Sequence, residues 1–249
     1  MTSSPGPSNG FDRCAARYDE LRPVDENWWE LFETLVELGA LRGARVLEIG
    51  CGTGRLAQAL EERALARVWA VDASPEMVAR TKSLGVNARV ARAEALPFKR
   101  GWFDAAVLRM VAHLVDRPRA FAEAARVLAP AGRLVIATED PAGFDDVWFA
   151  RWFPSVPELE RARFPDEPAL RAELAAAGLP DVRIERLSQA RTISREQALE
   201  VIRSKAYSTF ELLPQEEYDQ GLARAEAEHP EQLDYSFGWL IAVARRPAG

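Results

Sequence analysis

Two hydrophobic patterns alternate along the first half of the chain. Apolar side chains recur at helix spacing from Trp28 to Leu38, with Gly39 directly after them. From Arg45 onward, short apolar runs of strand length alternate with amphipathic stretches of about ten residues. Strands are expected at residues 45–49, 67–71, 86–91, 103–109 and 132–138. Helices are expected between them at residues 56–64, 75–83 and 118–128.

This alternation predicts an α/β fold. Strands that alternate with helices form βαβ units, which build a doubly wound (Rossmann-like), mainly parallel sheet with helices on both faces. Strands expected at 182–187 and 237–244 bring the sheet to seven strands. Because such sheets bind ligands outside the carboxyl ends of their strands, the loops after Ile49, Val71, Ala91 and Arg109 should carry the function.

The second half of the chain follows the pattern less regularly. Residues 144–164 are rich in aromatic residues and prolines, and helices are expected at 167–177, 195–210 and 215–228. We expect a helical cap over the site, formed by residues 11–40 and 189–231, within a single domain that spans residues 11–249. Residues 1–10 contain Ser, Pro, Gly and Asn but no apolar run, and are expected to be a disordered tail.

Charge and composition narrow the classes of partner. Thirty-eight acidic and 32 basic residues give a net charge of -6, which disfavours a nucleic-acid partner. A signal peptide and an apolar run long enough to span a membrane are both missing, so we expect a cytoplasmic protein without a membrane contact. Two cysteines and two histidines give no support for disulfides or a metal centre. A homodimer is left open.

A glycine-rich turn follows the first strand. Residues 46–54 read Val-Leu-Glu-Ile-Gly-Cys-Gly-Thr-Gly, so Gly50, Cys51, Gly52 and Gly54 stand between a strand and a helix. The glycines permit positive φ and a close approach of ligand to backbone. The spacing is G-x-G-x-G rather than the dinucleotide G-x-G-x-x-G, which disfavours an NAD enzyme. Glu48 is placed to accept from a cationic amino group. The alternative is a tight turn without a ligand.

Asp72 ends the second strand, 18 residues after Gly54. A carboxylate at this position can accept both hydroxyl groups of a ribose. The alternative is a cap for the helix that opens at Pro75, although Ser74 is also a good N-cap. Alone the residue is a weak signal, but its place at the adjacent strand tip supports the glycine turn.

The chain resembles small-molecule class I methyltransferases that use S-adenosylmethionine (SAM), related to ubiquinone and menaquinone biosynthesis enzymes. The resemblance covers roughly residues 11–139 and rests on five segments, namely residues 46–54, 71–77, 93–98, 103–104 and 124–135. It implies that SAM is the cofactor, with Glu48 and the glycines at its methionine part and Asp72 at its ribose. It also implies packing of Ala73 or Met77 on the adenine.

The same resemblance places other residues around the cofactor. Ala93 and Glu94 would flank the adenine edge, Tyr18 would close the methyl-donor side, and Arg109 would touch the donor or the sheet edge. For Tyr18 the alternative is a surface helix, and for Arg109 a structural ion pair. The chain departs from the family at Arg92, where relatives commonly have an acidic residue that accepts from the adenine amino group.

The expected chemistry is direct in-line methyl transfer to a small, partly apolar metabolite. His113 is the candidate base, because its unperturbed pKa lies near neutrality, and a hydrogen-bonded structural histidine is the alternative. Trp148, Trp152 and Tyr207 are the candidate substrate contacts, and the alternative, which the sequence favours, is that such aromatic residues pack the cap onto the sheet. Two rival functions are a non-catalytic SAM-binding module and another SAM-using transferase.

Overall fold

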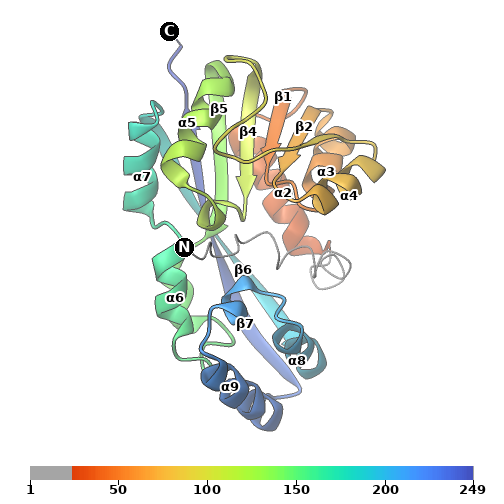
Figure 1. Ribbon diagram of the computed structural model, residues 1–249, viewed down its shortest axis with the longest axis vertical. Helices are drawn as coiled ribbons and strands as arrows, with labels where there is room; N and C mark the ends of the chain where they lie inside the picture. The colour runs from red at the N-terminus through yellow and green to blue at the C-terminus, as the bar shows by residue number, and fades with distance from the viewer. Residues whose placement is uncertain (1–23, 249) are drawn as a thin grey trace, which may run out of the picture.

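A seven-stranded sheet forms the centre of the protein in the computed structural model, which describes residues 24–248 (Figure 1). The expected tail and Tyr18 lie outside the described residues. The strand order is β3-β2-β1-β4-β5-β7-β6. The strands are β1 (Arg45–Ile49), β2 (Arg67–Asp72), β3 (Asn87–Val90), β4 (Phe103–Arg109), β5 (Leu128–Glu139), β6 (Asp181–Ser194) and β7 (Gln232–Arg245).

The sheet is mixed, which refines the expectation of a mainly parallel one. The first five strands in this order pair in parallel, whereas β7 is antiparallel to both β5 and β6. The chain between β6 and β7 leaves and re-enters at the same end of these two strands, so β7 returns in the opposite direction. Parallel strands need crossovers, and the helices of the first half supply them.

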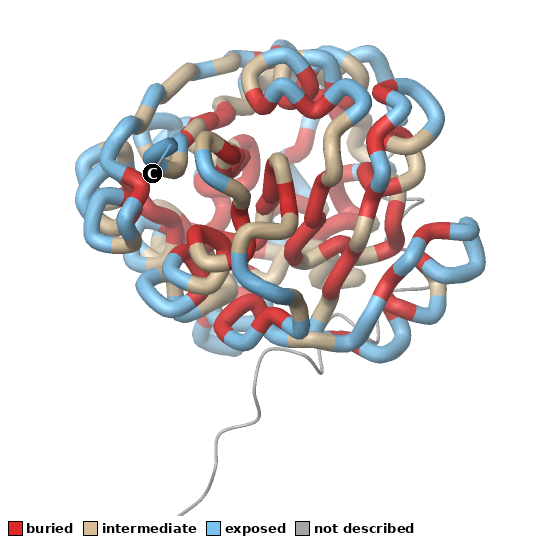
Figure 2. The backbone as a smooth tube through the Cα atoms, turned by 90° about the horizontal axis from the view of Figure 1, so that it is seen from above, coloured by how far each residue is buried: buried red, intermediate tan, exposed pale blue. Residues whose placement is uncertain are grey.

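Helices cover both faces of the sheet, as expected. The helices α2 (Glu26–Gly39), α3 (Arg55–Ala64) and α4 (Pro75–Ser83) lie on one face, and α5 (Arg117–Val127) and α7 (Glu167–Ala176) on the other (Figure 1). Side chains of one strand alternate between the two layers: Val46 packs with the first group, and Leu47 and Ile49 pack with the second. The carboxyl ends of the strands are thereby held between two packed layers, and Figure 2 shows buried residues gathered in the interior with exposed residues around the rim.

A second lobe lies beyond the carboxyl ends of the central strands (Figure 1). Strands β6 and β7 are 14 residues each, longer than the expected 182–187 and 237–244, and they remain paired to Ser194 and Gln232. Helices pack around these extensions with a separate aromatic core. They are α6 (Val156–Arg163), α8 (Arg195–Arg203) and α9 (Gln215–Glu228), with the short helices η2 (Pro141–Asp146) and η3 (Ser208–Glu211).

The composition of this lobe differs from the expected cap. Helix α2 packs on the sheet, because its apolar residues Leu31, Phe32 and Leu35 are buried in the sheet core. It also meets β6, where Asn27 Nδ2 donates to the Ala190 carbonyl over 3.1 Å. The aromatic segment 144–164 supplies much of the lobe instead.

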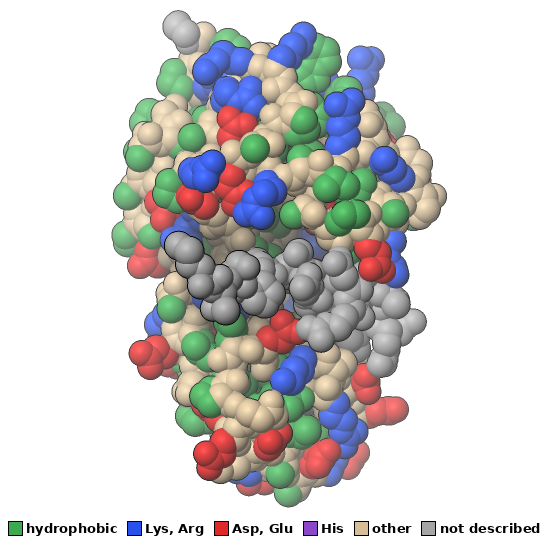
Figure 3. All heavy atoms as spheres, viewed as in Figure 1, with side chains coloured by type: hydrophobic (Ala, Val, Ile, Leu, Met, Phe, Trp, Pro, Cys, Tyr) green, Lys and Arg blue, Asp and Glu red, His purple; other side chains and the backbone are tan. Residues whose placement is uncertain are grey.

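Two further observations concern partners. Among residues 24–248, every helix falls short of the length and apolar character that a membrane span requires. Basic and acidic side chains are interspersed over the face drawn in Figure 3.

Candidate cofactor site and substrate cavity

The turn from β1 to α3 brings backbone close to its neighbours. Gly50, Gly52 and Gly54 have φ of 76°, 54° and 88°. A Cβ at Gly50 would lie 2.3 Å from Val111 and one at Gly54 2.8 Å from Thr81, so two of the three glycines are required by space as well as by φ. Gly54, the N-cap of α3, has no side chain that could accept from the first amides of the helix, so these amides are suited to donate to a ligand.

Glu48 lies under this turn. The side chain is buried, with 3% exposure, and among the described residues Oε2 has no hydrogen-bond partner. Burial raises the pKa of Glu48 to about 8, against the opposing effect of Arg109. A buried acceptor without a partner is costly, and a cationic amino group would satisfy it. Glu48 therefore fits the methionine part of SAM.

Cys51 contributes its backbone to the turn and a buried thiol to the core. Its Sγ lies 3.4 Å from Oγ1 of Thr81, and burial raises the pKa of the thiol well above its ordinary value. A protonated buried thiol is chemically inert, so the side chain packs and the backbone remains available to a ligand.

Asp72 ends β2 beside the glycine turn. Its Oδ2 accepts from the Gly52 amide over 2.9 Å, and its Oδ1 accepts from the Ser74 amide over 2.9 Å. Helix α4 is capped by Ser74, which accepts from the Met77 amide, so Asp72 is not the N-cap. Each carboxylate oxygen has a second lone pair, and the carboxylate is only half-buried. It is oriented by backbone and can still accept two hydroxyl groups.

The expected adenine side consists of small and apolar residues. Ala73 is exposed, whereas Met77 and Ala93 are buried. Glu94 is buried and already engaged: it accepts from the Asp116 amide over 3.0 Å and lies 3.3 Å from the guanidinium of Arg92. The arginine that departs from the family pattern is therefore paired with the neighbouring carboxylate, which leaves Glu94 less able to accept from an adenine amino group.

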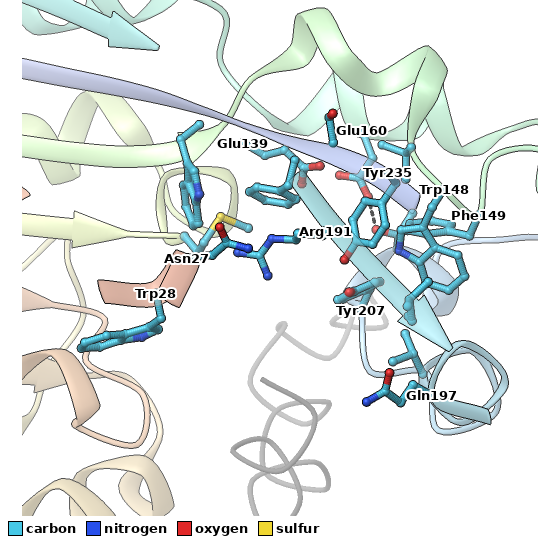
Figure 4. A pocket seen from close by; sticks show the side chains of 18 of the residues that line it. Asn27, Trp28, Glu139, Trp148, Phe149, Glu160, Arg191, Gln197, Tyr207 and Tyr235 are labelled. Atoms are coloured by element: carbon cyan, nitrogen blue, oxygen red, sulfur yellow. Dashed lines mark hydrogen bonds between the residues drawn. The ribbon is translucent and has the colours of Figure 1, made fainter. Parts of the chain in front are cut away.

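A cavity of about 1,100 Å³ opens between the ends of β4 and β5 and the second lobe (Figure 4). Arg109 lines it from the sheet side, with its guanidinium 5.7 Å from the centre of the Trp239 ring. Because Arg109 also acts on the pKa of Glu48, it lies between the candidate cofactor turn and the cavity. Trp148 and Tyr207 line the cavity from the lobe, where they were expected to contact substrate.

Trp152 does not line this cavity, contrary to the expectation. The side chain is 1% exposed in the core of the second lobe. Its indole N–H donates to Glu228 over 3.1 Å, and its ring stacks on His229. A buried tryptophan with a satisfied donor is a packing residue, and the sequence pattern could not separate it from Trp148.

His113 lines the cavity but has poor properties for a base. Its ring stacks on Phe164 with the centres 4.1 Å apart, and burial lowers the pKa of His113 to about 3, helped by Arg163. The neutral ring has a buried Nδ1 without a partner among the described residues. A base this weak removes protons poorly at neutral pH, whereas a neutral acceptor can hold a substrate hydrogen.

Sequence reasoning missed several residues of the cavity. Glu139, Glu160, Arg191 and Tyr235 all line it. Glu139 directly follows the expected strand 132–138. It could have been predicted, because ligands of such sheets bind outside the carboxyl ends of the strands. The other three come from irregular or extended segments with no local signal. Residues 24–248 contain no group of three His, Cys, Asp or Glu side chains arranged to hold a metal ion.

The fold, the glycine turn and the two carboxylates are arranged as expected for a class I SAM-dependent methyltransferase. Comparison with known proteins agrees: residues 47–136 match the family described as "Methyltransferase domain". The demethylmenaquinone methyltransferase of Thermus thermophilus is 36% identical over 72% of this chain and 94% of its own length. The malonyl-[acyl-carrier protein] O-methyltransferase of Geobacter sulfurreducens is 34% identical over 71% of this chain and 70% of its own.

A solved structure of the same fold is the geranyl diphosphate C-methyltransferase of Streptomyces coelicolor A3(2), in complex with S-adenosyl-L-homocysteine (SAH). It aligns with a TM-score of 0.54 and 17% identity, over 88% of this chain and 77% of that one. The chain belongs to the SAM-dependent methyltransferases, as the sequence predicted, and its cofactor is S-adenosylmethionine.

Proposed function

We propose that the protein transfers the methyl group of SAM to a small, partly apolar metabolite bound in the cavity beneath the second lobe. The observation that supports this most is the pair of adjoining sites. Oε2 of the buried Glu48 has no hydrogen-bond partner among the described residues and suits the cationic end of the cofactor, and Arg109 stands between Glu48 and a cavity with an aromatic wall. The volume of about 1,100 Å³ is ample for a small-molecule substrate.

The residues have distinct roles in this proposal. Glu48 and the turn 50–54 hold the methionine part, Asp72 the ribose, and Ala73, Met77 and Ala93 the adenine. SAM supplies an electrophilic methyl group, so the protein has only to orient the acceptor in line and exclude water. Trp148 and Tyr207 contact the apolar body of the substrate, and His113 accepts a hydrogen bond as a neutral ring rather than removing a proton.

The similarity to the relatives supports the proposed cofactor site more than the proposed substrate site. Residues 47–136 hold the turn, Asp72 and Arg109, whereas the lobe is built from segments beyond this range. The substrates in the names of the relatives are therefore not assigned to this chain. The acidic charge and the interspersed surface charges are consistent with a cytoplasmic enzyme that does not act on nucleic acid.

The test is methyl transfer from SAM labelled in its methyl group, offered with pooled small metabolites. We expect label in the small-molecule fraction with the wild type and very little with Asp72→Ala. SAH binding without label in any fraction would favour a non-catalytic SAM-binding module instead.

A further inference from the structure

Two carboxyl groups share one wall of the cavity. Glu139 ends β5 and Glu160 lies in the last turn of α6, and Figure 4 shows both beside Tyr235. Glu160 is buried, with 5% exposure. Thr209 donates its hydroxyl hydrogen to Oε1 of Glu160, and the guanidinium of Arg163 lies 3.6 Å from the same oxygen. Oε2 has no hydrogen-bond partner among the described residues.

The two carboxyl groups repel each other. Burial raises the pKa of Glu139 to about 8, and the charge of Glu160 raises it further against the effect of Arg191. Burial also raises the pKa of Glu160 to about 7, against Arg163. Each arginine compensates one carboxylate incompletely. A cation placed between the two groups would stabilise both ionised forms and satisfy the free oxygen of Glu160.

Aromatic rings line the same cavity as this pair. The ring centres of Trp148 and Tyr235 are 6.3 Å apart, and those of Phe149 and Tyr207 are 5.6 Å apart; all four residues line the cavity. The faces of aromatic rings attract cations, and their area suits an apolar body. The wall therefore combines a negative centre with an aromatic surround.

Acidic side chains outnumber basic ones over the whole lining of the cavity. Two arginines line the cavity among the described residues, and both lie toward the sheet or the strand extension, at Arg109 and Arg191. Six acidic residues line it, namely Asp25, Glu139, Glu160, Glu196, Glu200 and Asp234. An excess of negative charge raises the local concentration of cations and repels phosphate and carboxylate groups.

We propose that Glu139 and Glu160 together bind a protonated amino group of the methyl acceptor, which is a cationic amine with an aromatic or apolar body. This inference rests on the proposed function, because it assigns the substrate class of the same cavity. Glu160 and Glu139 are specificity-determining residues in this account. The amino group serves as the handle that orients the substrate.

The test uses three ligands with one indole body and different end groups: tryptamine, tryptophol and indole-3-propionate. Each is titrated calorimetrically into the full chain with SAH present, for the wild type and for Glu139→Gln, Glu160→Gln and Glu196→Gln. The wild type should bind tryptamine at least about tenfold more tightly than the other two. This preference should fall below about threefold in Glu139→Gln and Glu160→Gln. Glu196 is exposed on the same lining, so its variant should keep the preference.

The outcomes separate the inference from the proposed function. Normal SAH binding with no preference for tryptamine, or with no ligand bound below about 10 mM, overturns the amine site and leaves the methyltransferase account intact. Failure to bind SAH overturns the proposed function itself. The melting temperature of each variant shows whether it is folded; Glu160→Gln keeps an acceptor for Thr209 but removes the charge opposite Arg163, so its melting temperature is measured beside its binding.

Discussion

Glu48→Gln separates the charge of the buried carboxylate from its shape. With a pKa of about 8, against an ordinary value of 4.5, the carboxyl group is mostly protonated in the ligand-free protein at neutral pH. Binding of the SAH ammonium favours the ionised form, so wild-type binding at pH 7 should release about 0.9 proton. The affinity should rise as the pH approaches 8 and then level off. The glutamine amide of Glu48→Gln neither titrates nor carries a charge. In this variant both the proton release and the rise of affinity with pH should therefore disappear.

The size of the change follows from the same numbers. At about pH 8 the variant loses a charge-assisted hydrogen bond, worth about 1.5–3 kcal/mol or roughly 10–150-fold in affinity. Each pH unit below the pKa costs the wild type about 1.4 kcal/mol to ionise Glu48, so the two proteins should converge near pH 6. The assay is SAH calorimetry near pH 6, 7 and 8, in buffers of different ionisation enthalpy. Glu62→Gln, on the exposed face of α3, is the matched control.

The pH dependence of protein stability gives an independent check of the raised pKa of Glu48. A carboxyl group whose pKa is raised by folding contributes stability fully below its unfolded value, and that contribution is lost as the pH rises through about 8. Glu48→Gln should therefore melt higher than the wild type near pH 8, and the difference should shrink toward pH 5. A wild-type affinity independent of pH, with the same loss in Glu48→Gln at every pH, would refute the reasoning.

Three further predictions concern the ribose, the turn and the cavity. Asp72→Ala should weaken SAH binding by about 2–4 kcal/mol in calorimetry, and should lower the melting temperature because the Gly52 and Ser74 amides lose their acceptor. Gly54→Ala should cost about 2–3 kcal/mol of stability in urea denaturation, since φ is 88° and Thr81 is too close, whereas Gly143→Ala, with open space around it, should cost less than about 1 kcal/mol. His113→Phe should leave the pH profile of methyl transfer unchanged between about pH 6 and 9, because the depressed pKa of about 3 keeps the ring neutral there. Wild-type activity that falls toward about pH 6, with this fall absent in His113→Phe, would instead restore His113 as the base. The same depressed pKa should make wild-type stability fall below about pH 6.5, where only the unfolded chain protonates this ring.

The first half of the fold could be predicted because its local patterns agree with its tertiary role. Helix α4 spans residues 75–83 as expected, since Pro75 and the Ser74 cap fix its start. Strand β1 also matches at 45–49, because it is buried on both faces and its apolar residues Val46, Leu47 and Ile49 mark it. The glycine turn follows it directly.

The second lobe could not be predicted in the same way. The outer half of β6 has few apolar residues, so its sequence carries no clear strand signal. In the outer half of β7, Leu233, Tyr235 and Phe237 do alternate with polar residues, and this pattern could have extended the expected strand. The pairing of these outer halves depends on partners 38 or more residues away, as Ser194 opposite Gln232 illustrates. Trp148 and Trp152 belong to one aromatic stretch, and only packing decides which of them faces the cavity.

The cavity residues Glu139 and Glu160 show the same limit for the site. They are 21 positions apart in different elements, and the electrostatic interaction between them arises only because η2 and α6 fold back beside the end of β5. Glu139 can be located from the sequence because it lies at the carboxyl end of an expected strand. The position of Glu160 depends on how the second lobe folds.

A crystal structure of the protein with SAH tests the central claim most directly. The account predicts the SAH amino group within about 3 Å of the free Oε2 of Glu48 and both ribose hydroxyl groups on Asp72, with the sulfur facing the cavity beside Arg109. A complex in which Glu48 still has no partner, or in which SAH lies away from residues 48–54 and 72, would contradict it.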